Sequence, residues 1–274
     1  MPARIVDGKA VVAAVRERVA AEVVAFEAER GRTPMLVTVI VGDDPASEVY
    51  VAGKHRACEQ VGIRSSHHGL PAETTEGELL ALVEELNADR DVDGILVQLP
   101  VPEQIDPDRI IAAIDPGKDV DGLTPINAGR LAQGMPGLVS CTPAGVIELL
   151  RHEGVELEGA EVAVVGRSKL VGIPVSRLLL MANATVTMCH SRTRDLAAVC
   201  RRADVLVAAV GVPRLLGGEA IKPGAVVIDV GINRTEEGLK GDVEFAGASE
   251  RATHQGFASV PRLRLFVAMV VDSE

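Results

Sequence analysis

The chain has no tryptophan, one tyrosine and four phenylalanines, so aromatic side chains make up only 2% of its 274 residues. Aliphatic side chains must therefore fill the core. Hydrophobic residues make up 47% of the chain, which is enough for that purpose. This length suits two modest domains better than one.

Basic residues are also scarce: 28 Lys and Arg stand against 39 Asp and Glu, which gives a formal net charge of −11. Such a charge repels nucleic acids and anionic membranes, so we expect neither as a partner. No apolar run approaches the roughly 20 residues that cross a bilayer. The sequence shows no signal peptide, and we expect a soluble cytoplasmic protein.

Potential disulfide and metal-binding patterns are missing too. The cysteines are widely spaced without a C-x-x-C pair, which predicts reduced thiols. Six histidines include no H-E-x-x-H pair, and the adjacent His67 and His68 point to opposite sides of a strand or around a helix. We therefore expect no metal. The cysteines are Cys58, Cys141, Cys189 and Cys200.

The first half of the chain alternates between helical and strand patterns. Apolar residues recur at helical spacing over 11–26 and 79–86, and short apolar runs at 36–41 and 94–99 indicate strands. A helix from Pro45 to about Gly62 lies between them. Continuous apolar strands separated by helices predict an α/β fold with a parallel sheet covered on both faces.

A second alternating series begins with a helix near 142–152. We interpret residues 140–254 as a Rossmann-type domain and residues 1–139 as a separate α/β domain. The predicted strands of the second series are 161–165, 185–189, 205–210 and 225–230.

The first strand of this series runs into a glycine turn that is typical of dinucleotide sites. Gly166 permits a tight turn, Gly172 lets helix and strand approach, and Pro174 suits the first helical position. Free N–H groups at the helix start would then face a pyrophosphate. The spacing is not G-x-G-x-x-G, so a plain turn between strand and helix remains an alternative.

The end of the next strand favours NADP over NAD. An NAD site places an acid about 20 residues after the glycine turn, but here Ser191, Arg192 and Arg194 follow the strand. A hydroxyl and guanidinium groups suit a 2′-phosphate. A solvated basic turn is the alternative. Glycines in the later strand ends at 208–213 and 229–233 permit close approach to the ribose and nicotinamide.

Tyr50 and Lys54 are spaced to share one face of the helix that begins at Asp44 and Pro45. For an isolated pair, a half-buried Tyr and a solvated Lys on a surface helix is the better explanation. The other motifs change that judgement, because together they resemble the bifunctional methylenetetrahydrofolate dehydrogenase/methenyltetrahydrofolate cyclohydrolase family. They are V-G-D-D-P-A-S at 41–47, Tyr50-x-x-x-Lys54, D-G-I-L-V-Q-L-P at 93–100, K-D-V-D-G at 118–122, C-T-P at 141–143, G-R-S at 166–168 and V-G-I-N at 230–233.

The resemblance covers nearly the whole chain to about residue 254. It implies NADP-dependent oxidation of 5,10-methylenetetrahydrofolate, followed by hydrolysis to 10-formyltetrahydrofolate. It also implies a homodimer, a role in one-carbon metabolism and purine biosynthesis, and a folate-binding catalytic domain at 1–139. The residues that we predict to bind NADP are Gly166, Arg167, Ser168, Ser191, Arg192, Gly211 and Ile232.

The resemblance also assigns roles in the folate site. Lys54 is the catalytic amine, Tyr50 packs on the folate, Gln98 orients Lys54, and Asp121 holds the pterin. A partly buried lysine can have its pKa lowered into a useful range, and a neutral Gln can bond it without fixing it as a cation. Without the resemblance, Gln98 as a partner of backbone groups and Asp121 in an Asx-turn are the better explanations.

One segment departs from the pattern. Such enzymes usually carry P-V-P-G-G-V-G-P-M-T, a loop that touches both ligands, where residues 255–266 here read Q-G-F-A-S-V-P-R-L-R-L-F. A natural divergence, a deliberate replacement and a sequence error all remain open. We expect residues 255–274 to pack back on the first domain. Alternatives are an NADP-binding protein with impaired or lost folate activity and an NADP dehydrogenase with another substrate.

Overall fold

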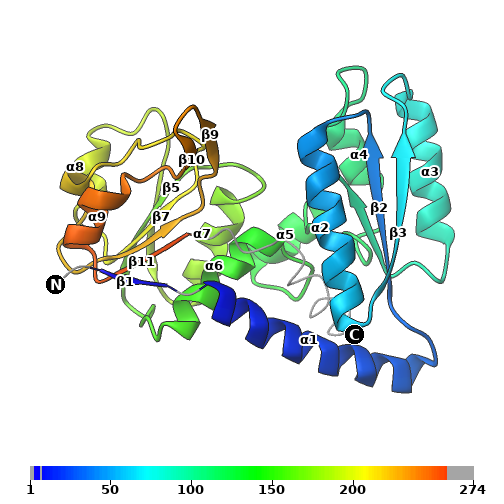
Figure 1. Cartoon of the computed structure of the whole chain (residues 1–274), viewed down its shortest axis with the longest axis horizontal. Helices are drawn as coiled ribbons and strands as arrows, with labels where there is room; N and C mark the ends of the chain where they lie inside the picture. Colours follow the sequence, from blue (N-terminus) through cyan, green and yellow to red (C-terminus); the bar gives the residue numbers. More distant parts are fainter. Residues whose placement is uncertain (1–2, 7, 258–274) are drawn as a thin grey trace. The chain divides into compact units, whose positions relative to one another are not determined.

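A computed structural model of the chain describes residues 3–6 and 8–257 (Figure 1). The chain divides into two compact units. Among the described residues, the first unit contains Ala13–Cys141, and the second contains those from Thr142 to Phe257 together with those up to Val12. Both units are built from parallel strands and helices, so the predicted α/β class is confirmed.

The first unit contains a three-stranded parallel sheet in the order β3-β2-β4. These strands are β2 (Met35–Val41), β3 (Arg64–Leu70) and β4 (Gly94–Val97). The helices α1 (Gly8–Arg30) and α6 (Cys141–His152) each run across the division between the units. The other helices are α2 (Pro45–Val61), α3 (Glu76–Ala88), α4 (Pro107–Ala113) and α5 (Pro125–Gln133).

The period of two along β2 determines what each face of this sheet contacts. Val37, Val39 and Val41 share one face, where they form a buried core with side chains of α3 and α4. The intervening Thr38 points to the opposite face, where it contacts His55 of α2. The helices therefore cover both faces, and the sheet brings α2 next to the end of β4.

Polar caps determine where several of these helices begin. Thr75 and Glu78 form a capping box at the start of α3, in which each side chain accepts from the other residue's backbone N–H. Asp106 and Thr124 accept from backbone N–H groups in the first turns of α4 and α5. Each of these two caps precedes a proline, which suits the first helical position because that N–H is unpaired anyway.

The second unit contains a six-stranded parallel sheet in the order β1-β11-β8-β7-β5-β6 (Figure 1). Its strands are β1 (Arg4–Ile5), β5 (Glu161–Val165), β6 (Thr185–Cys189), β7 (Val205–Ala208), β8 (Val226–Asp229) and β11 (His254–Phe257). The hairpin of β9 (Asn233–Thr235) and β10 (Gly238–Lys240) is separate from it. The helical elements are α7 (Gly172–Met181), α8 (Leu196–Cys200), α9 (Phe245–Arg251) and the 3-10 helix η1 (Gly218–Ala220).

The strand order of this sheet locates a ligand site. The chain passes from β5 to β6 on one side and then returns to β7 on the other side of β5. Open α/β sheets bind ligands outside the carboxyl ends of the strands at such a switch point. Val165 pairs with both Cys189 and Ala208, so the loops after β5, β6 and β7 leave the sheet at the same level.

Three strands of the two parallel sheets were not foreseen. β3 has the polar sequence R-S-S-H-H-G-L and forms the edge of the first sheet. β1 and β11 add two strands to the second sheet. Residues 255–257 were expected to pack on the first domain together with the rest of the segment 255–274, but they belong to the second unit's sheet. Residues 258–274, which we expected to pack on the first domain, lie outside the described residues.

Candidate functional site

Lys54 lies within α2 and is buried, with an exposed fraction of 4%. Its Nζ donates a hydrogen bond to Oε1 of Gln98 at 3.2 Å. Gln98 follows β4 directly, and its backbone N–H donates to the carbonyl of Val39 on β2. The structure thus brings these two predicted site residues together at the carboxyl edge of the first unit's sheet.

A second contact orients the Gln98 amide. Its Nε2 donates to the backbone carbonyl of Leu99 at 2.7 Å, which leaves Oε1 to face the amine of Lys54. Gln98 is 5% exposed, so water has little access to this contact. A neutral carbonyl oxygen accepts from either protonation state of an amine without an opposing full charge. The pair is therefore suited to holding an amine that exchanges protons.

Tyr50 belongs to the same helix, four residues before Lys54. Residues at this spacing lie on the same face of a helix. The side chain of Tyr50 lies outside the part of the structure that is described, so its contact with a folate stays a prediction.

Asp121 lies in the loop between α4 and α5 and is half-buried. Two residues earlier, Asp119 is 2% exposed, and its Oδ2 accepts from the backbone N–H of Thr124 and from Nδ2 of Asn127. Asp119 therefore fixes the loop against the start of α5. The Asp121 carboxylate, by contrast, makes no hydrogen bond within the described residues, so it can accept N–H donors from a ligand.

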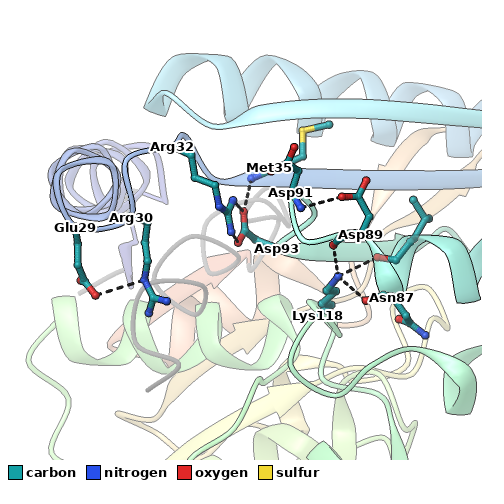
Figure 2. A network of polar contacts seen from close by, with 10 residues as sticks. Glu29, Arg30, Arg32, Met35, Asn87, Asp89, Asp91, Asp93 and Lys118 are labelled. Carbon is teal, nitrogen blue, oxygen red and sulfur yellow. Dashed lines mark hydrogen bonds and ion pairs between the residues drawn. The ribbon is translucent and has the colours of Figure 1, made fainter.

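Lys118 anchors the other side of the same loop, as Figure 2 shows. Its Nζ donates to the carbonyls of Leu86, Asn87 and Asp89 at the end of α3, at 2.9, 2.8 and 2.6 Å. Burial lowers the pKa of Lys118, and the nearby Asp115 is the largest of the opposing influences. The K-D-V-D-G motif thus contains two structural residues that hold the half-buried Asp121 in place.

The Asp93 carboxylate also has a structural role (Figure 2). It accepts two hydrogen bonds from the Arg32 guanidinium, both at 2.6 Å, and one from the backbone N–H of Met35. Asp93 precedes β4 and Met35 begins β2, so this contact fixes the amino-terminal ends of the two strands. The opposite ends of the same strands lie next to Lys54 and Gln98.

A polar cluster under α2 was not predicted. The Thr38 Oγ1 lies 3.0 Å from Nε2 of His55 and 3.2 Å from Nδ1 of His67. The Nδ1 of His55 lies 2.6 Å from Oγ of Ser65. Burial lowers the pKa of His55, and the charges of His67 and Lys54 lower it further. The residue next to Lys54 is therefore tied to both β2 and β3, which fixes α2 against the sheet.

The glycine turn of the second unit is as tightly built as its sequence suggested. Gly166 has φ of +129°, and a Cβ there would lie 2.2 Å from the carbonyl oxygen of Ala209. A Cβ on Gly172 would lie 2.2 Å from the carbonyl oxygen of Gly166. The loop after β5 therefore packs closely against the loop after β7 and the start of α7. This shape is the close backbone approach that a pyrophosphate site needs.

One detail of this turn was predicted wrongly. α7 begins at Gly172 and not at Pro174, which is its third residue. Proline is tolerated there because the first N–H groups of a helix have no intrahelical partner. Within the turn, the Ser168 Oγ accepts from the backbone N–H of Val171 at 3.1 Å, while Arg167 and Ser168 are exposed.

Ser191 and Arg192 lie in the turn after β6 and are both exposed. The turn is closed by His190 and Thr193: the Thr193 N–H donates to the His190 carbonyl, and the His190 N–H donates to Oγ1 of Thr193. The side chains of Ser191 and Arg192 therefore extend from a fixed turn at the carboxyl edge of the sheet, which suits the binding of a phosphate.

Gly211 and Ile232 follow β7 and β8 at the same edge. Gly211 has φ of +69°, and Ile232 is 50% exposed. Sequence reasoning missed the buried acids nearby, Asp229 and Asp242, which bind backbone N–H groups of these loops. For Asp229, the available signal was an acid directly after the apolar strand residues 226–228.

Two general features concern only residues 3–6 and 8–257. No group of three or more His, Cys, Asp or Glu side chains there could hold a metal ion. No helix in that part of the chain is long and apolar enough to cross a membrane. All four cysteines are buried free thiols, and burial raises the pKa of Cys58 and of Cys200 to about 12.

Known proteins resemble both units. Residues 6–121 match the family described as tetrahydrofolate dehydrogenase/cyclohydrolase, catalytic domain, and residues 140–261 match the NAD(P)-binding domain of the same family. The chain is 58% identical to bifunctional protein FolD 2 of Frankia alni over 252 residues, which are 92% of this chain and 88% of that protein.

Solved structures agree. The bifunctional enzyme FolD from Campylobacter jejuni has a TM-score of 0.94 at 40% identity and covers 98% of each chain. The FolD of Trypanosoma brucei, complexed with NADP cofactor and inhibitor, has a TM-score of 0.90 at 38% identity and covers 99% of this chain and 95% of that one. The resemblance seen in the motifs is thereby confirmed, and the chain belongs to the tetrahydrofolate dehydrogenase/cyclohydrolase family.

Proposed function

We propose that this protein oxidises 5,10-methylenetetrahydrofolate to 5,10-methenyltetrahydrofolate with NADP and hydrolyses that product to 10-formyltetrahydrofolate. Family membership supports both activities. The observation that carries the proposal is the buried contact between Lys54 and Gln98, which lies within the residues that match the family's catalytic domain.

The hydrolytic step needs a group that moves protons. Water adds to the methenyl carbon, one bond from that carbon to nitrogen breaks, and the nitrogen gains a proton. A base must take a proton from the water, and an acid must supply one to the departing nitrogen. The amine of Lys54, oriented by Gln98, is suited to this transfer because the pair is shielded from bulk water.

Two further residues of the first unit complete the proposed folate site. Asp121 presents a half-buried carboxylate from a loop that Lys118 and Asp119 hold on both sides. A carboxylate only accepts hydrogen bonds, so it suits the amino and ring N–H donors of a pterin. Tyr50, one helical turn before Lys54, would supply a flat apolar surface for the folate ring.

The residues of the second unit fit the dinucleotide. When bound, NADP accepts the hydride in the oxidation step. The glycine turn and the start of α7 would hold its pyrophosphate, the turn after β6 its 2′-phosphate, and the loops after β7 and β8 its ribose and nicotinamide. The residues concerned are Gly166, Arg167, Ser168, Ser191, Arg192, Gly211 and Ile232.

Substitution of the amine tests the assignment. We expect Lys54→Met to lose cyclohydrolase activity, measured as the disappearance of methenyltetrahydrofolate, while NADP affinity measured by calorimetry stays near that of the unaltered protein. Lys222→Met is the matched control, because Lys222 is a partly exposed lysine of the second unit that pairs with Asp204. A Lys54→Met protein that hydrolyses at the original rate would refute the role of Lys54.

The altered segment 255–266 supports one alternative, an NADP-binding protein with impaired or lost folate activity. By the resemblance, this segment occupies the position of the family's glycine-rich loop, which contacts both the folate and the cofactor. Separate titrations with NADP and with a tetrahydrofolate derivative distinguish the two functions. The alternative predicts heat from NADP alone, whereas the main proposal predicts heat from both ligands.

We also propose a cytoplasmic homodimer that supplies one-carbon units for purine biosynthesis. The four free, buried cysteines are consistent with a reducing compartment. Sedimentation velocity would test the dimer: a single species with the mass of one chain at micromolar concentration would contradict it.

A further inference from the structure

Two buried carboxylates in the second unit lie outside the residues so far assigned to the reaction. Asp229 is the last residue of β8 and is 1% exposed, and Asp242 follows β10 and is fully buried. Burial of a carboxylate is costly unless several donors satisfy it. The identity of those donors therefore indicates what the two residues do.

The donors of Asp242 come from two cofactor loops. Its Oδ2 accepts from the backbone N–H groups of Val210 and Gly211, at 2.6 and 3.0 Å. Its Oδ1 accepts from Nδ2 of Asn233 at 2.9 Å. One carboxylate thus joins the loop after β7 to the loop after β8, at the carboxyl edge of the sheet.

Asp229 holds Asp242 in turn. Its Oδ1 accepts from the backbone N–H groups of Gly231 and Asp242, at 2.9 and 3.0 Å, and its Oδ2 accepts from that of Val243 at 2.9 Å. Burial raises the pKa of Asp229, these three hydrogen bonds lower it, and the charge of Asp242 raises it. The two acids therefore form a chain of contacts through three loops.

The glycine of the V-G-I-N motif is explained by the same contact. A Cβ on Gly231 would lie 2.2 Å from Oδ1 of Asp242, which leaves no room for any side chain. The motif at 230–233 and Asp242 therefore depend on one another, although they are separated in sequence by the β9–β10 hairpin.

We propose that Asp242 is a positioning residue for the cofactor half of the reaction. It fixes the backbone of Gly211 and of residues 231–233 in the shape that receives the ribose and nicotinamide of NADP. This role rests on the proposed function. Asp242 belongs to the second unit and the proposed catalytic Lys54 to the first, so we expect the two activities to respond differently to substitution of Asp242.

Asp242→Asn is a substitution of nearly equal shape but opposite hydrogen-bonding character. A carboxylate accepts at both oxygens, whereas an amide has one acceptor and one donor. The new amide must therefore turn its NH₂ either toward the two backbone N–H groups or toward the NH₂ of Asn233. We expect the dissociation constant for NADP, measured by calorimetry, to rise about ten- to a hundredfold.

A compensating substitution makes the test specific. In the double variant Asp242→Asn with Asn233→Asp, the amide oxygen at 242 can face Val210 and Gly211 while its NH₂ donates to the new carboxylate at 233. We expect this exchange to recover most of the NADP affinity. Asn233→Asp alone places two carboxylates against each other and should weaken NADP binding as Asp242→Asn does.

Cyclohydrolase activity, assayed without NADP, should stay within about twofold of the original in all three variants, because water and methenyltetrahydrofolate are its only reactants. Equal NADP affinity in Asp242→Asn and the unaltered protein would overturn the inference, as would equal losses of cyclohydrolase activity and NADP affinity. A double variant that folds but binds NADP as weakly as the single variants would also overturn the inference.

Folding and the proposed function are checked separately. Circular dichroism reports whether each variant folds. If Asp242→Asn does not fold, Asn233→Ala takes its place, because it removes only one donor to Asp242. An unchanged NADP affinity in folded Asn233→Ala would overturn the inference. Failure of the unaltered protein to bind NADP would instead contradict the proposed function.

Discussion

Gln98→Glu tests most directly whether Lys54 must exchange protons. The change keeps the size of the side chain and places a carboxylate where Oε1 now lies, 3.2 Å from Nζ of Lys54. Two unit charges at this distance attract by about 5 kcal/mol at an effective dielectric constant of about 20. The substitution should therefore favour the ammonium form of Lys54 strongly over the amine.

The attraction sets an upper limit for the effect. If all of it acted on the proton equilibrium, the activity profile would move by about 4 pH units, since 1.36 kcal/mol corresponds to one unit. Part of it is lost because the new carboxylate is itself buried and costly to ionise. We therefore expect the alkaline shift of cyclohydrolase activity to be at least about one unit, with a much lower rate at neutral pH.

The assay is the rate of methenyltetrahydrofolate loss as a function of pH, corrected for the uncatalysed reaction. Gln60→Glu is the matched control, because Gln60 lies exposed on the same helix as Lys54 and its substitution adds the same charge. NADP affinity should not change in either variant. A Gln98→Glu protein with the original pH profile would show that the protonation state of Lys54 does not limit the rate of hydrolysis.

Three further predictions concern other contacts. Arg192→Ala should raise the KM for NADP about tenfold and leave that for NAD nearly unchanged, because only the 2′-phosphate loses a charged donor; equal effects on both cofactors would refute the assignment. Lys118→Met removes the donor of three carbonyls at the end of α3, so the free energy of unfolding should fall by about 1–3 kcal/mol and the KM for folate should rise. His55 has a lowered pKa in the folded protein, so the unfolded chain binds its proton first as the pH falls through about 6.5. Stability should therefore be retained above that pH and lost as the pH falls toward the folded pKa, and in His55→Gln urea titrations should show a smaller loss.

The sequence predicted those strands whose two faces are both buried, because burial on both faces requires apolar side chains along the whole strand. β2, β5, β7 and β8 are covered on both faces, so they appear as continuous apolar runs. β3 is an edge strand whose polar side chains contact α2 and solvent, and its pairing with β2 uses backbone groups that any sequence provides.

The candidate site likewise contains features that the sequence predicted and features that only the structure shows. Glycines and strand ends indicated the dinucleotide turn, because close backbone contact excludes other residues there. The contact of Lys54 with Gln98 joins residues far apart in sequence, and it was expected only from the family resemblance. Asp229, Asp242 and Asp119 were not foreseen, since a carboxylate next to a turn is usually solvated and only the folded chain shows the N–H groups around it.

The altered segment at 255–266 begins inside a strand, and this determines which activity it threatens. β11 ends at Phe257, whose backbone pairs with Asp229 of β8, and Gly256 packs against Val6 with no space for a Cβ. Strand pairing uses backbone groups, so the pairing of β11 with β8 does not depend on which side chains residues 255–257 carry. The loop that resemblance assigns to both ligands, by contrast, does depend on its side chains. NADP binding should therefore be retained more fully than dehydrogenase activity, since hydride transfer requires both reactants to be aligned at contact distance.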